Sequence, residues 1–135
     1  MAQLPETYDV VVVGGGPVGE NAAARVVRGG LSAVLVEAEL VGGECSYWAC
    51  TPSKALLRPG AAVQAARRVA GAAEAVTGPL DAAAVLARRD SFASGWDDAG
   101  QVEWLAGAGI DLVRGRGRLA GARRVEVIGE DGGTR

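Results

Sequence analysis

The amino-acid sequence predicts an α/β fold with a parallel sheet, a helical segment and a small antiparallel sheet. The apolar, β-branched run Tyr8–Val13 is closed by three glycines, which is typical of a strand buried on both faces. A helical pattern over Pro17–Arg28 stops at Gly29-Gly30, and a second apolar run follows at Ala33–Glu37. Together they form a strand–helix–strand unit of about 30 residues, the size of one right-handed crossover.

The rest of the chain divides into helical and then extended segments. Alanine-rich patterns predict helices over Ala61–Val76, Asp81–Ser94 and Asp97–Ala106, with a break at Gly78-Pro79 and with Asp81 as an N-cap. Glycines then separate three short runs that predict small antiparallel strands: Ile110–Gly115, Gly117–Gly121 and Arg123–Gly129.

The end of the chain has the pattern of a β-hairpin whose second strand is only begun. The run Gly129–Gly133 is a turn signal, and Thr134-Arg135 would start a return strand. With 135 residues, of which 49% are hydrophobic, the chain suits one domain with a real core. We therefore expect residues 1–135 to be the N-terminal part of a longer domain, incomplete at its C-terminal end.

Composition excludes several classes of function. The net charge is −2, the arginines are scattered and only 4% of residues are aromatic, so we expect no nucleic-acid partner. The N-terminus lacks the features of a secretory signal and no apolar run reaches a membrane span, so we expect a cytoplasmic protein with no membrane contact. Two cysteines without any histidine cannot form a closed zinc site, so we expect no metal. A reactive or redox role for these thiols is then favoured over a disulfide framework.

The run Gly14–Gly19 matches the G-x-G-x-x-G pattern of dinucleotide-binding turns. Gly14 would allow the tight turn, Gly16 the close approach of a pyrophosphate, and Gly19 the close packing of helix on strand. The alternative is a glycine-rich turn in a glycine-rich protein. Glu37 ends the second strand 23 residues after Gly14, where a carboxylate would bind a ribose rather than stand as an exposed strand-end charge. Because this carboxylate would repel a 2'-phosphate, we expect an FAD- or NAD-type ligand.

Both cysteines and the only lysine lie in one short stretch, VGGECSYWACTPSKALL (Val41–Leu57). Cys45 and Cys50 are separated by four residues, which allows a disulfide only where the intervening segment curls, as at a helix start. A cation nearby, such as Lys54, would lower the pKa of a thiol there. The alternative is a pair of small buried hydrophobes.

The stretch Gly42–Leu57 resembles the GG-x-C-x-x-x-x-C-x-P-S-K-x-L-L signature of the pyridine nucleotide-disulfide oxidoreductases, a flavoenzyme family. The resemblance is strong over residues 8–58 and looser over 110–127. It implies a Rossmann-like FAD-binding domain, of which residues 1–135 are the N-terminal part. The nicotinamide-binding and dimerisation domains of the family would lie outside this chain.

The resemblance also implies roles for single residues. Cys45 becomes the interchange thiol, Cys50 the flavin-side thiol, and Lys54 a charge near the reactive edge of the flavin. The residues implied to hold FAD are Gly14, Gly16, Pro17, Gly19, Glu37, Gly43, Cys45, Lys54 and Gly117. Electrons would pass from NADH or NADPH through FAD to the Cys45–Cys50 disulfide, and then to a small-molecule or protein disulfide. The full-length protein would be a homodimer.

Some positions depart from the family pattern and leave the acceptor open. Tyr47 and Ala49 stand where Asn and Gly are familiar, Glu44 replaces a Thr or Ser, and Trp48 adds bulk. Tyr47 and Trp48 would either wall a substrate channel or pack in the core. The family's acid-base histidine comes from a distant domain of the partner subunit, so we expect this chain alone to be inactive. The alternatives are a flavin-binding module without thiol catalysis, and a quinone or metal-ion reductase.

Overall fold

The computed structural model describes residues 4–129 and 132–134. The chain forms two compact units, which are described separately. The sheet unit contains the residues up to Gly43 and those from Asp97 onward, and the helical unit contains Glu44–Trp96.

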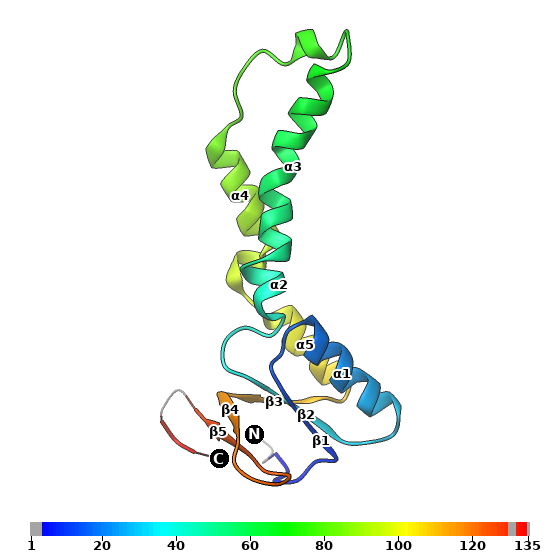
Figure 1. Cartoon of the computed structure of the whole chain (residues 1–135), viewed down its shortest axis with the longest axis vertical. Helices are drawn as coiled ribbons and strands as arrows, with labels where there is room; N and C mark the ends of the chain where they lie inside the picture. Colours follow the sequence, from blue (N-terminus) through cyan, green and yellow to red (C-terminus); the bar gives the residue numbers. More distant parts are fainter. Residues whose placement is uncertain (1–3, 130–131, 135) are drawn as a thin grey trace. The chain divides into compact units, whose positions relative to one another are not determined.

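The sheet unit is built on three parallel strands in the order β1-β2-β3 (Figure 1). The predicted strand–helix–strand unit is confirmed: β1 (Val10–Val13) leads into α1 (Pro17–Arg28) and then β2 (Ala33–Glu37). The first strand is shorter than predicted. The backbone amide of Asp9 donates to the Ser32 side chain at 2.9 Å instead of joining the strand ladder.

One predicted strand has a different partner from the one expected. The expectation that Ile110–Gly115 joins an antiparallel sheet is wrong, because β3 (Asp111–Arg114) pairs in parallel with β2 and places Leu112 opposite Leu35. Helix α5 (Ala99–Gly107) precedes β3 and returns the chain to the sheet edge, so the strand runs in the same direction as β2.

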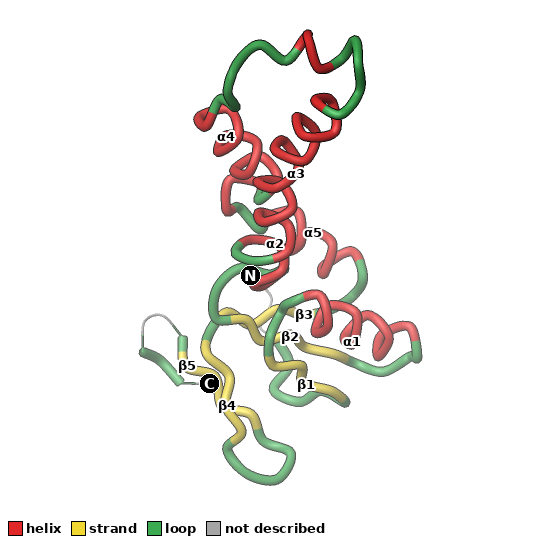
Figure 2. Tube along the Cα trace, turned by 45° about the horizontal axis from the view of Figure 1, so that its top comes forward, coloured by secondary structure: helices red, strands yellow, loops and turns green. Residues whose placement is uncertain are grey.

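The core lies between the sheet and the helices α1 and α5, which Figure 2 shows in red beside the yellow strands. Two alanines of α1 let the helix backbone approach β2 closely, and Leu35 is completely buried there. The cluster of buried residues consists of Ala23, Ala24, Ala33, Leu35, Val41, Leu105 and Ile110.

The predicted small antiparallel sheet is confirmed for two of its three runs, and it packs against the face of the main sheet that presents Val13 and Val36. It pairs β4 (Arg116–Leu119) with β5 (Val125–Ile128). Of the predicted return strand, Thr134 forms a bridge with Ile128, and Arg135 lies outside the described residues. Two residues of the predicted turn, Glu130 and Asp131, also lie outside them. The predicted α/β fold class is therefore confirmed.

The helical unit contains α3 and α4, which run side by side in Figure 1. Its elements are α2 (Gly43–Tyr47, which begins at the last residue of the sheet unit), α3 (Cys50–Arg67), the 3-10 turn η1 (Ala73–Ala75), α4 (Ala82–Phe92) and the 3-10 turn η2 (Ser94–Trp96). Within the described ranges, no helix has the length and apolar character needed to cross a membrane.

The predicted helix Ala61–Val76 is wrong at both ends. Helix α3 already begins at Cys50, because Pro52 lies in its first turn, where a missing amide costs no intrahelical bond. The helix ends at Arg67, and Gly71 then adopts a left-handed φ of +87° that turns the chain.

The predicted N-cap of α4 is confirmed, since the Asp81 carboxylate accepts a hydrogen bond from the Ala84 amide at 3.1 Å. We expect Asp81→Ala to lower the free energy of unfolding by about 1 kcal/mol, because this amide loses its acceptor. Urea unfolding monitored by circular dichroism measures the change. Asp90→Ala, which removes an exposed carboxylate from the same helix, is the control and should change stability much less. Equal losses in the two variants would contradict a specific capping role.

Candidate functional site

The glycine turn connects β1 to α1 and favours glycine at Gly14 for its backbone conformation and at Gly19 for lack of space. Gly14 adopts a φ of +103°, which favours glycine, and its amide donates to the Val36 carbonyl at 2.8 Å. A Cβ at Gly19 would lie 1.9 Å from the Gly14 carbonyl oxygen. Helix α1 can approach the end of β1 this closely only because Gly19 lacks a side chain.

The start of α1 has the geometry of an anion site. Gly16 is the N-cap residue and, having no side chain, leaves the first amides of the helix without a side-chain cap. Pro17 begins the first turn. The amides of a first helical turn have no intrahelical acceptor, and the helix dipole favours a negative group there. A Cβ built on Gly16 meets nothing within 4 Å, so the space beside the turn is open. This open cradle at a helix N-terminus fits a pyrophosphate.

Glu37 places its carboxylate beside the glycine turn. Its Oε2 accepts the Gly15 amide at 2.6 Å, and its Oε1 accepts the Glu39 amide at 2.8 Å. Both oxygens are therefore fixed at the end of β2, with lone pairs left for further donors such as ribose hydroxyls. Gly15 was not singled out in the sequence, yet a Cβ there would lie 2.8 Å from Leu35 Cδ2 and 3.1 Å from Glu37 Oε2. Its position inside the glycine pattern is the only sequence signal that could have found it.

Residues 37–43, which we call the strap, cross beside the glycine turn. The Gly42 amide donates to the Gly15 carbonyl at 2.7 Å, and Gly42 and Gly43 both have left-handed φ values, +111° and +56°. A Cβ at Gly43 would lie 2.9 Å from the Gly16 Cα. The structure therefore brings Gly14, Gly16, Gly19, Glu37 and Gly43 together in the sheet unit.

Gly117 lies on β4, where the small sheet touches the end of β1. A Cβ there would lie 3.0 Å from Cγ1 atoms of both Val13 and Val36. The glycine thus lets β4 lie close to the strand that enters the glycine turn.

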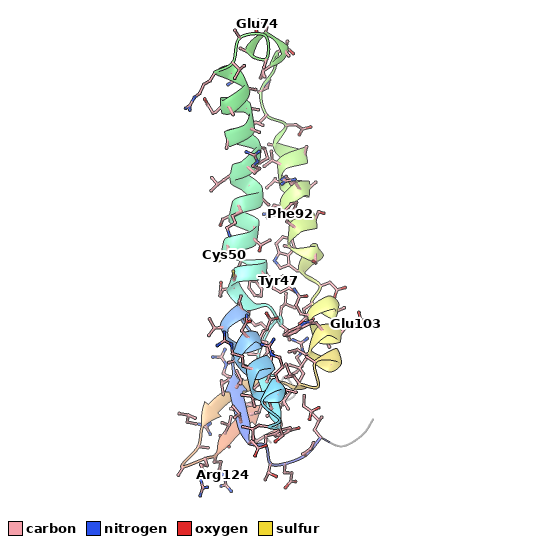
Figure 3. The ribbon with its side chains drawn as sticks, turned by 90° about the vertical axis from the view of Figure 1, so that its right-hand side faces the viewer. Tyr47, Cys50, Glu74, Phe92, Glu103 and Arg124 are labelled. Atoms are coloured by element: carbon pink, nitrogen blue, oxygen red, sulfur yellow. The ribbon has the colours of Figure 1, made fainter. Side chains whose placement is uncertain are left out.

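The two cysteines and the lysine lie in the helical unit. Cys45 is in α2, and Cys50 is the first residue of α3, where Figure 3 labels it. Lys54 follows Cys50 by four residues on the same helix, which places both on one helical face. Between α2 and α3, the Ala49 amide donates to the Glu44 carbonyl at 2.6 Å and curls the segment between the thiols. Both cysteines are free thiols in this structure.

The two thiols interact with each other. A hydrogen bond with Cys50 raises the pKa of Cys45, and burial and the charge that Cys50 carries when ionised act in the same direction. The positive charge of Lys54 acts on the pKa of Cys45 in the opposite direction, which shows that the lysine is close enough to influence this thiol. The structure therefore brings Cys45, Cys50 and Lys54 together.

The aromatic residues between the thiols have different environments. Tyr47 is 1% exposed, so it packs in the interior, whereas Trp48 is 44% exposed. Their rings meet edge to face, with centroids 5.7 Å apart. Of these two rings, that of Trp48 is the exposed one. Over the part of the chain that the structure describes, no group of three or more His, Cys, Asp or Glu residues is arranged to hold a metal ion.

Comparison with known proteins gives consistent matches over almost the whole chain. The family model described as pyridine nucleotide-disulphide oxidoreductase matches residues 8–134. The dihydrolipoyl dehydrogenase of Thermus scotoductus is 36% identical over 96% of this chain, and dihydrolipoyl dehydrogenase 3 of Pseudomonas putida is 37% identical over 94% of it. The chain spans only 28% of the length of each of these relatives.

Two solved structures share the fold. LpdA from Mycobacterium tuberculosis matches 93% of this chain and 28% of its own, with a TM-score of 0.73 and 23% identity. The HOCl-induced flavoprotein disulfide reductase RclA from Escherichia coli, solved as a Cu(II) complex, matches 97% of this chain and 26% of its own. Its TM-score is 0.76 and its identity is 19%.

The two glycines of the turn should respond differently to alanine. We expect Gly19→Ala to destabilise the protein by about 3 kcal/mol or more, because its Cβ would overlap the Gly14 carbonyl oxygen. Gly16→Ala, whose Cβ meets open space at a φ of −73°, should leave the unfolding midpoint almost unchanged and weaken only dinucleotide binding. Urea unfolding and ligand titration of both variants measure this difference. A stable Gly19→Ala protein would contradict the close approach of α1 to β1.

The interaction between the thiols can be tested by titration. We expect Cys50→Ala to lower the pKa of Cys45, because the hydrogen bond that raises it is removed. The measurement is the pH dependence of the alkylation rate of Cys45 by iodoacetamide, followed at this residue by mass spectrometry. Ser53→Ala, a neutral change at an exposed residue of α3, is the control and should leave the pH midpoint unchanged. An unchanged midpoint in Cys50→Ala would show that the two thiols act independently.

Proposed function

The chain belongs to the pyridine nucleotide-disulphide oxidoreductase family, and we propose that it supplies the FAD-binding and redox-thiol part of an FAD-dependent NAD(P)H:disulfide oxidoreductase. The observation that carries the proposal is the thiol pair. Cys45 in α2 is partly exposed, Cys50 at the start of α3 is exposed, and Cys50 and Lys54 both act on the pKa of Cys45. Two small hydrophobes packed in a core would be buried and would need no cation beside them.

The sheet unit has the features that hold a dinucleotide. The first turn of α1, from Gly16 and Pro17, would bind the pyrophosphate, Glu37 would accept the ribose hydroxyls, and Gly14 and Gly19 would maintain the turn. Gly43 and Gly117 would let the strap and β4 lie close to the ligand. Lys54 and Cys45 would face the flavin. Bound FAD would supply transfer of two electrons between NAD(P)H and the thiol pair.

The thiols would transfer electrons to an acceptor by exchange. The Cys45 thiolate would attack the acceptor disulfide, form a mixed disulfide and release one acceptor thiolate. The Cys50 thiolate would then attack Cys45 Sγ, close the Cys45–Cys50 disulfide and release the second thiolate. Two electrons leave the pair, and the acceptor disulfide gains them.

The first exchange step needs a base. Since hydrogen bonding to Cys50 raises the pKa of Cys45, this thiol is harder to deprotonate than a free cysteine. The 135 residues contain no histidine, so a general base near neutrality would come from outside them. This is consistent with the proposal of a homodimer, in which a partner subunit completes the site.

The acceptor, the choice between NADH and NADPH, the homodimer and the cytoplasmic location all stay predictions. The exposed indole of Trp48 lies between the two cysteines in sequence and would be the first surface that an acceptor meets. The alternatives are a flavin-binding module without thiol catalysis, and a quinone or metal-ion reductase.

The spectrum of the full-length protein that carries this sequence distinguishes these functions. On anaerobic reduction with NADH or NADPH, we expect a long-wavelength band from contact between the Cys50 thiolate and the flavin. Cys50→Ser should abolish the band, whereas the matched variant Cys45→Ser should retain it and lose only disulfide reduction. If the flavin is reduced and no such band appears, the thiols take no part in electron transfer. That result would favour the flavin-binding module or the quinone or metal-ion reductase.

A further inference from the structure

Asp98 is the N-cap residue of α5, but its side chain does not cap that helix. An N-cap aspartate ordinarily accepts an amide from the first turn of its own helix. Among the described residues, Asp98 makes no such bond, and the adjacent Asp97 accepts the Ala99 amide at 2.8 Å. The Asp98 carboxylate is directed elsewhere.

The Asp98 carboxylate and the Arg114 guanidinium both bind the backbone of the strap. Asp98 Oδ2 accepts the Val41 amide at 2.7 Å and Arg114 Nη2 at 2.5 Å. Arg114 also donates from Nη1 to the Glu39 carbonyl at 2.5 Å. The Asp98 side chain is 12% exposed, whereas the Arg114 side chain is 41% exposed, so the pair lies at the edge of the core with its carboxylate inside. The two side chains thus bind an amide and a carbonyl of the strap.

The strap connects the two parts of the site that need a fixed position. Arg114 is opposite Glu37 in the parallel register of β2 and β3, and the Gly115 amide donates to the Glu37 carbonyl at 2.9 Å. At the other end, Gly43 lies so close to Gly16 that a Cβ on Gly43 would be 2.9 Å from the Gly16 Cα. Between them, Val41 is completely buried, so a shift of the strap would also expose core surface.

We infer that Asp98 and Arg114 are positioning residues that clasp the strap, so that Glu37 and Gly43 flank the glycine turn before the dinucleotide binds. The inference rests on the proposed function, because it concerns the same site. A preorganised site binds its ligand more tightly, because binding does not have to supply the free energy needed to order the strap. Asp98 and Arg114 contact the strap backbone at Val41 and Glu39, so the clasp acts through Glu37 and Gly43 at the two ends of the strap.

The experiment measures FAD affinity in the full-length protein, after removal of its flavin, by quenching of flavin fluorescence. We expect Asp98→Ala and Arg114→Met to bind FAD about tenfold more weakly. Asp90→Asn, which removes a surface ion pair with Arg89 on α4, is the control and should bind as the unmodified protein does. Unchanged affinity in both clasp variants would overturn the inference.

A second set of variants separates positioning from general stability. In a Glu37→Gln background, Asp98→Ala should weaken FAD binding by less than about threefold, because the carboxylate that the clasp positions is already lost. A full tenfold loss in that background would overturn the positioning role. If Asp98→Ala does not fold, FAD affinity is measured instead for Asp98→Asn and Arg114→Met, with and without Glu37→Gln, after their melting temperatures are shown to be unchanged. Unmodified protein that binds no FAD would instead refute the proposed function.

Discussion

The proposed dinucleotide site depends on the close approach of the α1 backbone to the end of β1. With a Cβ at Gly19, the Gly14 carbonyl would be displaced, and with it the turn that directs the first helical amides outward. Two buried alanines, Ala23 and Ala24, continue the same close approach along α1, so the helix packs on the sheet over its length. Small residues along one face of α1 therefore allow both the packing of the hydrophobic core and the position of the proposed anion site.

The strap is held by polar contacts because its backbone has no neighbouring strand along most of its length. The Gly42 amide, the Val41 amide and the Glu39 carbonyl each find a partner in a different element, respectively the glycine turn, α5 and β3. A backbone group left unpaired beside the core would cost about 1–3 kcal/mol, so these contacts set the path of the chain. The chain continues from Gly43 to Glu44 and the thiol segment without a linker.

The features that the sequence predicted are those with a local signal. Helix α1 and strand β2 have the predicted boundaries because glycines stop the helix and an apolar run defines the strand. The partner of β3 could not be predicted from its own residues, since the direction of pairing depends on the preceding helix α5. Helix α3 begins at Cys50, earlier than the predicted Ala61, and Pro52 lies in its first turn, where a proline does not break a helix. Asp98 and Arg114 join segments distant in sequence, and Asp98 resembles an ordinary N-cap, so no pattern indicates their contact with the strap.

The arrangement of the thiols bears on where the acid-base chemistry must lie. Two sulfurs that share one hydrogen bond release their second proton with difficulty, because the product would place two negative charges side by side. Lys54 offsets this effect in part, but a cation stabilises a thiolate without accepting its proton. Under the proposed function, the reduced dithiol would hold an electron pair that the disulfide form lacks, and a separate base would be needed to deliver it to an acceptor. The 135 residues contain no histidine, so we propose that this base comes from a residue outside them.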